Sequence, residues 1–138
     1  MFKVDVNTRE LHGDTRYKKL RETFAEIVMT TPTLQACPQS IKSSAIGCHL
    51  YGSRDDRAMC ELLMMLLRSI LIEAEMGCCT NKSGVKHFVK VKTNQKWYLC
   101  DPLLERQTNG IPHFKYFLLN RQYLEAMHHE RYEGLDTS

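Results

Sequence analysis

The sequence contains no Cys-x-x-Cys pair, no internal repeat, no Gly-, Ser- or Pro-rich linker and no long hydrophobic run. Its longest apolar run, from Leu62 to Leu67, is far shorter than the roughly 20 residues of a membrane-spanning helix. The amino terminus also lacks the basic and apolar regions of a secretory signal. We therefore expect one domain over residues 1–138, with a loose tail at 133–138, in a cytoplasmic protein that does not enter a membrane.

Charge is nearly balanced along the chain. The 138 residues include 19 Lys and Arg against 16 Asp and Glu, which gives a net charge of +3. The basic residues are interspersed with acidic ones and form no dense stripe, so nucleic-acid binding is not expected. The basic positions Lys86, Lys90, Lys92 and Lys96 are interpreted as a solvated face. A hydrophobic content of 43% and a charged content of 25% are typical of a folded globular domain.

Six cysteines are present: Cys37, Cys48, Cys60, Cys78, Cys79 and Cys100. Most lie inside apolar segments rather than at the loop-rich spacing of a disulfide scaffold, so we expect free thiols in a reducing compartment. Zinc prefers paired ligands, and the sequence offers only the adjacent Cys78-Cys79 and His128-His129. We predict no metal site and no cofactor.

The hydrophobic periodicity predicts two helices. Asp14-Thr15 can cap the first, which has five apolar residues at helical spacing: Tyr17, Leu20, Phe24, Ile27 and Val28. Residues 33–52 mix polar, Pro and Gly positions and are interpreted as irregular chain. Asp55 and Asp56 can then begin a second helix, whose residues 58–68 are apolar on nearly all sides and predict a central position.

Two strands joined by a turn are predicted between Lys86 and Asp101, after a half-buried strand at Ile72, Ala74 and Met76. A turn centred on Asn94 would oppose Val91 to Trp97 and Val89 to Leu99. The same register brings His87 opposite Asp101, an imidazole beside a carboxylate. Beyond Pro102 we expect irregular chain, then a short helix from Leu119 to Tyr132.

An imidazole oriented by a carboxylate is a good proton acceptor for a nearby thiol. A cysteine in the first turns of a buried helix could supply that thiol, because the helix amino end lowers the thiol pKa and can hold an oxyanion. Cys60 fits this position best, Cys48 is the second candidate and Cys37 the third. The sequence thus predicts a catalytic set of Cys60, His87 and Asp101.

Two motifs resemble the transglutaminase-like core. The run His87-Phe88-Val89-Lys90-Val91-Lys92 followed by Lys96-Trp97-Tyr98-Leu99-Cys100-Asp101-Pro102 is similar to the family's H-x-W-V-x-V and W-Y-x-x-D-P strands. Upstream, the run from Gly52 to Ala58, the apolar helix and Gly77 resemble its G-x-C-x-D-x-A helix region. The resemblance covers residues 52–102.

The resemblance implies an α+β, papain-like fold and a Cys-His-Asp triad for peptide or amide hydrolysis, deamidation or acyl transfer on a protein or peptide substrate. His87 and Asp101 match the family's His and Asp. The nucleophile position falls on Arg54 in an ungapped match, or on Asp56 when the strand is matched at Glu73-Ala74, and Cys60 lies at least one turn further on. Two hypotheses follow: a thiol enzyme, or an inactive module that binds a protein partner.

Overall fold

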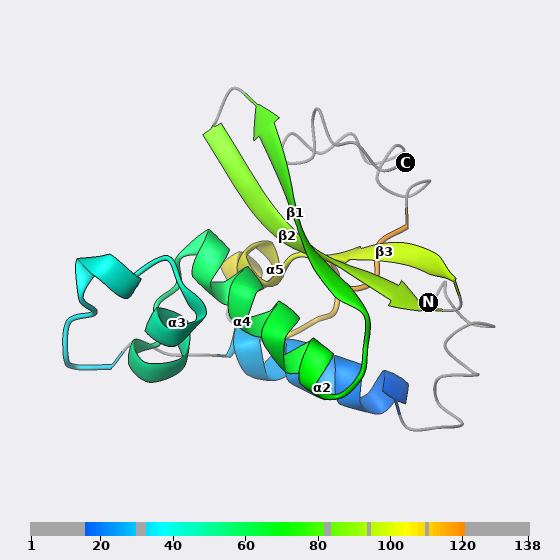
Figure 1. Cartoon of the computed structure of the whole chain (residues 1–138), viewed down its shortest axis with the longest axis horizontal. Helices are drawn as coiled ribbons and strands as arrows, with labels where there is room; N and C mark the ends of the chain where they lie inside the picture. The colour runs from blue at the N-terminus through cyan, green and yellow to red at the C-terminus, as the bar shows by residue number, and fades with distance from the viewer. Residues whose placement is uncertain (1–15, 30–32, 82–83, 94, 110, 121–138) are drawn as a thin grey trace.

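The computed structural model describes residues 16–29, 33–81, 84–93, 95–109 and 111–120. Its elements, in chain order, are α2 (Arg16–Val28), the 3-10 helix η1 (Gln39–Ile41), α3 (Ala45–Tyr51), α4 (Asp56–Ser69), β1 (Ala74–Asn81), β2 (Gly84–Thr93), β3 (Lys96–Cys100) and α5 (Pro102–Asn109). The strands form an antiparallel sheet in the order β1-β2-β3, and α4 packs on it (Figure 1). The prediction of an α+β chain with a central helix on a small antiparallel sheet is confirmed.

Helix α2 contributes one apolar face to the core. Its buried residues are the five that the sequence periodicity selected, Tyr17, Leu20, Phe24, Ile27 and Val28. The helix packs against α4, and the Phe24 ring also lies 5.0 Å from the ring of Phe117, centroid to centroid. This helix therefore lies beside α4 in the main core, which it shares with the sheet (Figure 1).

Helix α4 begins with the predicted cap. The Asp55 carboxylate accepts a hydrogen bond from Ala58 N at 3.2 Å, which satisfies one of the free N–H groups of the first turn. From Ala58 onward half of the residues of α4 are buried, and Leu63 and Leu67 are fully so. Burying a leucine of this kind contributes about 1.5–3 kcal/mol. Because α4 touches both α2 and the sheet, it is the centre of the main core.

The predicted register of the hairpin is wrong by one residue. In the structure Val91 pairs with Tyr98 and Val89 with Cys100, and Lys92 rather than Val91 pairs with Trp97. Tyr98 and Cys100 consequently share the buried face with the two valines, while Trp97 stays 37% exposed. The predicted facing pair of His87 and Asp101 does not occur, because β3 ends at Cys100 opposite Val89.

Three other predictions also change. The segment 33–52, predicted to be irregular, contains η1 and α3, and α3 ends at Gly52, whose left-handed φ of 68° lets its N–H reach Cys48 O. The strand predicted at residues 72–76 begins at Ala74 and continues to Asn81 as β1. Leu119, predicted to start a helix, instead bridges to Leu99. The rest of that predicted helix and the tail at 133–138 lie outside the described residues.

The second face of the sheet is covered by chain without regular structure. Tyr116 and Leu119 pack there against Phe88, Leu99 and Cys79 in a smaller apolar cluster. Both faces of the sheet are thus buried in part. None of the helices in the described ranges is both long and apolar enough to span a membrane.

Candidate functional site

The first turn of α4 meets strand β2 through one carboxylate. Asp56 Oδ2 accepts a hydrogen bond from the backbone N–H of His87 at 2.5 Å, and it lies 3.2 Å from Nδ1 of the same residue. The two side chains are 19% and 22% exposed, so the contact lies at the edge of the core with access to solvent. A neutral ring that carries its proton on Nδ1 would donate it to this carboxylate.

His87 is therefore oriented by a carboxylate, as the sequence predicted, but by a different one. The resemblance places Asp56 at the nucleophile position, not as the partner of the histidine. The two residues are 31 positions apart in the sequence, and the packing of α4 on β2 brings them together. On the other side of β2, His87 pairs with Cys78 of β1, whose side chain is exposed.

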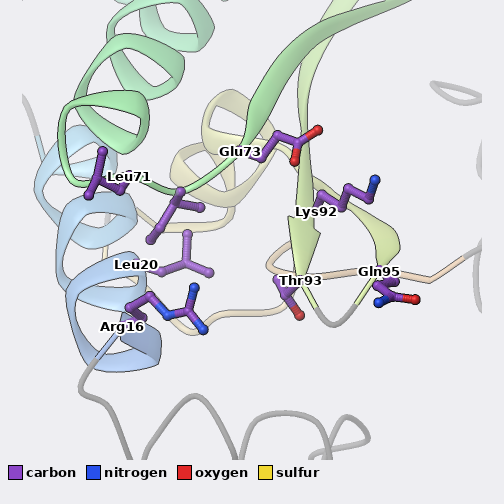
Figure 2. Close-up of a pocket in the computed structure, with 8 residues that line it drawn as sticks. Arg16, Leu20, Leu71, Glu73, Lys92, Thr93 and Gln95 are labelled. Carbon is purple, nitrogen blue, oxygen red and sulfur yellow. The ribbon is translucent and has the colours of Figure 1, made fainter.

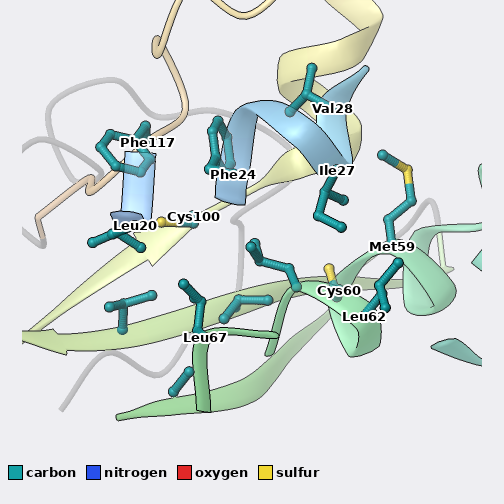
Figure 3. Packing of buried hydrophobic residues seen from close by; sticks show 14 of the residues in the cluster. Leu20, Phe24, Ile27, Val28, Met59, Cys60, Leu62, Leu67, Cys100 and Phe117 are labelled. Atoms are coloured by element: carbon teal, nitrogen blue, oxygen red, sulfur yellow. The ribbon is translucent and has the colours of Figure 1, made fainter. Parts of the chain in front are cut away.

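Cys60 lies one helical turn after Asp56, on the same face of α4. Its side chain is 0% exposed and belongs to the main apolar cluster. Figure 3 shows the sulfur among apolar side chains that α4 and α2 contribute, with Ile27 and Met59 nearby. A thiol in that position is a small hydrophobic group of the core, and a substrate cannot reach it without local opening of the fold.

The other two thiol candidates differ in exposure. Cys48 is buried in α3 with 0% exposure, whereas Cys37 is half-buried and its thiol lies 3.5 Å from the carbonyl oxygen of Pro38. Cys100 is buried in the main cluster, and burial raises the pKa of its thiol to about 12. The main cluster thus contains three buried thiols, Cys48, Cys60 and Cys100, and Cys79 is buried in the smaller cluster.

Asp101 begins helix α5. Its Oδ1 accepts a hydrogen bond from Leu104 N at 3.1 Å, its carbonyl accepts one from Glu105 N, and its own N–H donates to Tyr116 O. The residue is 0% exposed. These contacts are those of a helix cap that also ties β3 to the segment 111–120.

Glu105 is a buried carboxylate that the sequence analysis missed. It is 0% exposed and accepts hydrogen bonds from the backbone N–H groups of His113, Phe114 and Tyr116. It lies one turn after Asp101, at the helical i+4 spacing, and that spacing was the available signal. Together the two carboxylates fix the chain that covers the second face of the sheet.

The two residues that the resemblance places at the nucleophile position have different surroundings. Arg54, which the ungapped match places there, is exposed and precedes the Asp55 cap of α4. Asp56, which the shifted match places there, contacts His87. In the shifted match, the residue at the nucleophile position of α4 is therefore the one that contacts His87.

Metal binding finds no support within the described ranges, where no three His, Cys, Asp or Glu side chains gather around one point. His128 and His129 lie outside those ranges. No protein-family model, no curated protein and no solved structure matches the chain.

Proposed function

We propose that this chain is a catalytically inactive module with a transglutaminase-like, papain-like fold, which binds a protein partner. The observation that carries the proposal is the contact between Asp56 and His87 at the amino end of α4. A carboxylate at that point orients the imidazole, but it cannot supply the thiolate on which cysteine-dependent amide chemistry relies.

The burial of Cys60 supports the same proposal. Thiol catalysis needs a sulfur that reaches both the base and the substrate carbonyl, and such cysteines are at least partly exposed. Cys60 is 0% exposed in the apolar cluster beneath α2. A catalytic role would require α4 to lose part of its packing on each turnover.

Exposed apolar side chains are the support for a protein partner. Leu71 is 87% exposed and Leu50, on α3, is 58% exposed. Side chains of this kind are buried when proteins associate, because removing apolar area from water is favourable. A bound partner would bury these two leucines, whereas thiol chemistry gives no reason for their exposure.

An Asp56→Cys variant tests whether this turn is the position from which a nucleophile has been lost. A thiol there would lie beside His87, which can take its proton, so we expect iodoacetamide to modify it at pH 6.5 at least 10-fold faster than an ordinary thiol. Peptide-resolved mass spectrometry would measure the rate at each cysteine.

Two variants serve as controls. Asp55→Cys puts a thiol at the same helix amino end but away from the imidazole, and it should react more slowly than the thiol at position 56. Combining Asp56→Cys with His87→Ala should remove the part of the enhancement that the imidazole supplies. Equal rates for the thiols at positions 55 and 56 would contradict the proposal that Asp56 occupies the nucleophile position.

A further inference from the structure

Strand β1 is an edge strand, because β2 is its only neighbour among the described strands (Figure 1). Glu73 and Lys92 extend the register of β1 and β2 by one pair (Figure 2), and Lys92 N–H donates to Glu73 O at 2.9 Å. In an antiparallel pair, residues that bond to the neighbouring strand alternate with residues whose N–H and C=O point away from it. The outward-pointing set, counted in twos from Glu73, is Ala74, Met76, Cys78 and Thr80.

Two further contacts agree with this alternation. Arg68 Nε, on α4, donates to Ala74 O at 2.8 Å, so that carbonyl points away from β2. His87 lies opposite Cys78, and its N–H donates to Asp56 rather than to β1. The backbone groups of Cys78 are therefore not used by β2 and point to the outer edge.

The outer edge of β1 is open along its second half. Within the described ranges no hydrogen bond reaches the outward backbone groups of Met76, Cys78 and Thr80. Such edges are usually blunted by lysine, proline or a bulge. β1 contains neither lysine nor proline, its pairing with β2 has no bulge, and its one charged residue, Glu75, is ion-paired with Lys90 at 3.6 Å. An edge without these devices accepts another strand.

We propose that a second copy of this chain adds its own β1 to this edge, antiparallel, about a two-fold axis at Cys78. Cys78 then lies opposite Cys78 of the second copy, and Met76 lies opposite Thr80. Each of these pairs exchanges two backbone hydrogen bonds, so every open N–H from Met76 to Thr80 meets an open C=O. This inference does not rest on the proposed function, whose evidence is the contact of α4 with His87.

The axis at Cys78 is the one that the open groups allow. Moving it by one residue toward the start of β1 would use the Ala74 carbonyl, which Arg68 already holds. Moving it by one residue toward the end would set Met76 against a position beyond Asn81, where β1 ends. The closed and open parts of the edge therefore fix the register.

The surroundings of the edge suit a second copy better than a peptide of another protein. A bound peptide gains specificity from side-chain pockets along the edge. The cavity of about 320 Å³ in Figure 2 is lined by Glu73 but by no residue of β1. In the pair of copies, Glu75 is the one charged residue among the opposed positions, and it comes opposite Asn81. No like charges meet across the axis, which would be destabilising.

The second copy also covers apolar area beside the strands. Arg68 reaches the outer edge from α4, so Met65, three residues earlier, lies on the same side of the helix. Its side chain is 52% exposed. A two-fold axis normal to the sheet puts the α4 helices of both copies on one face of the joined sheet. Burial of Met65 against the second copy then adds to the strand hydrogen bonds.

Sedimentation of charge variants tests the symmetry of this contact. We expect the native chain to approach twice its mass of 16.1 kDa as its concentration rises. Cys78→Lys sets two like charges against each other and should weaken the dimer about 5-fold, and an equimolar mixture of Cys78→Lys and Cys78→Glu should restore it. Thr80→Lys puts the same charge on the same exposed face but not opposite itself, and should weaken the dimer less than about 2-fold.

Equal losses in Cys78→Lys and Thr80→Lys, or a mixture that stays monomeric, would contradict the axis. A native chain that stays at 16.1 kDa up to the highest soluble concentration would leave the edge to a strand of another protein and overturn the inference.

Disulfide formation by diamide, which takes two electrons and two protons from a pair of thiols, tests the register. Opposite Cys78 residues have Cα atoms about 5.5 Å apart, within the range of a disulfide, so we expect Cys78 to Cys78 as the main link between copies. When Cys78→Ser is combined with Thr80→Cys, the thiols of the two copies lie about 14 Å apart along the strands and should link at least about 10-fold more slowly. Equal rates would show random collision and contradict the inference.

Discussion

The first two turns of α4 belong to different environments. In the first turn, Asp56 is 19% exposed and its carboxylate holds His87, while Asp55 caps the helix. One turn later Cys60 is 0% exposed and surrounded by apolar side chains. The helix thus passes from polar contacts to a dry core within four residues. The turn with the thiol lacks access, and the turn with access carries a carboxylate.

A change of charge on each of the two turns should give the largest difference between them. Cys60→Asp buries an ionisable group without a designed partner, and we expect a loss of at least about 3 kcal/mol in the free energy of unfolding. Asp56→Asn removes a charge from the half-exposed turn and should cost about 1 kcal/mol. Urea denaturation measures both, and similar losses would show that the second turn is not a dry core.

Two of the helices were predictable because their signals lie within or next to their own residues. Helix α2 has a single buried face, so helical spacing selected all five of its buried residues. Helix α4 was identified by its Asp cap and its apolar run. Short α3 was missed, although Ser44 precedes it and Gly52 ends it, because its seven residues carry too little periodic signal.

The hairpin register was not predictable from alternation. In β3 both Trp97 with Leu99 and Tyr98 with Cys100 are apolar pairs, so each face of the strand could be the buried one. Tyr116 and Leu119 cover the second face, so Leu99 is buried too. A strand with two covered faces loses the alternation that would fix its register, and a slip of one residue exchanges the faces.

The prediction of the candidate site was wrong for the same reason, because it depended on the hairpin register. The predicted contact of His87 with Asp101 depended on the register, whereas the observed contact with Asp56 depends on the packing of α4 on β2. Packing between elements 31 residues apart is not encoded in local spacing. Asp101 instead satisfies a local requirement, the cap of α5, which its position before Pro102 already favoured.

The pH dependence of stability sharpens the description of the core. Burial raises the pKa of Cys100 to about 12 from 9.0, so its thiol stays protonated in the folded chain where the unfolded chain has lost the proton. The stabilising effect is complete below about pH 9 and is lost between pH 9 and 12, at about 1.4 kcal/mol per pH unit.

Comparing urea denaturation at pH 8 and pH 10 in the native chain and in Cys100→Ala tests this. The variant loses some packing at both pH values, but its stability should fall less steeply between them. An identical slope in the two proteins would show that Cys100 is not in a dry environment.

We propose above all that the thiol on α4 takes no part in chemistry. Alkylation of the native, unmodified chain by iodoacetamide between pH 6 and 8, followed by mass spectrometry of the Cys60 peptide, tests it most directly. The account predicts that Cys60 reacts far more slowly than free glutathione and that His87→Ala leaves the rate unchanged. Modification of Cys60 faster than glutathione below pH 7, lost in His87→Ala, would contradict it and restore the thiol enzyme.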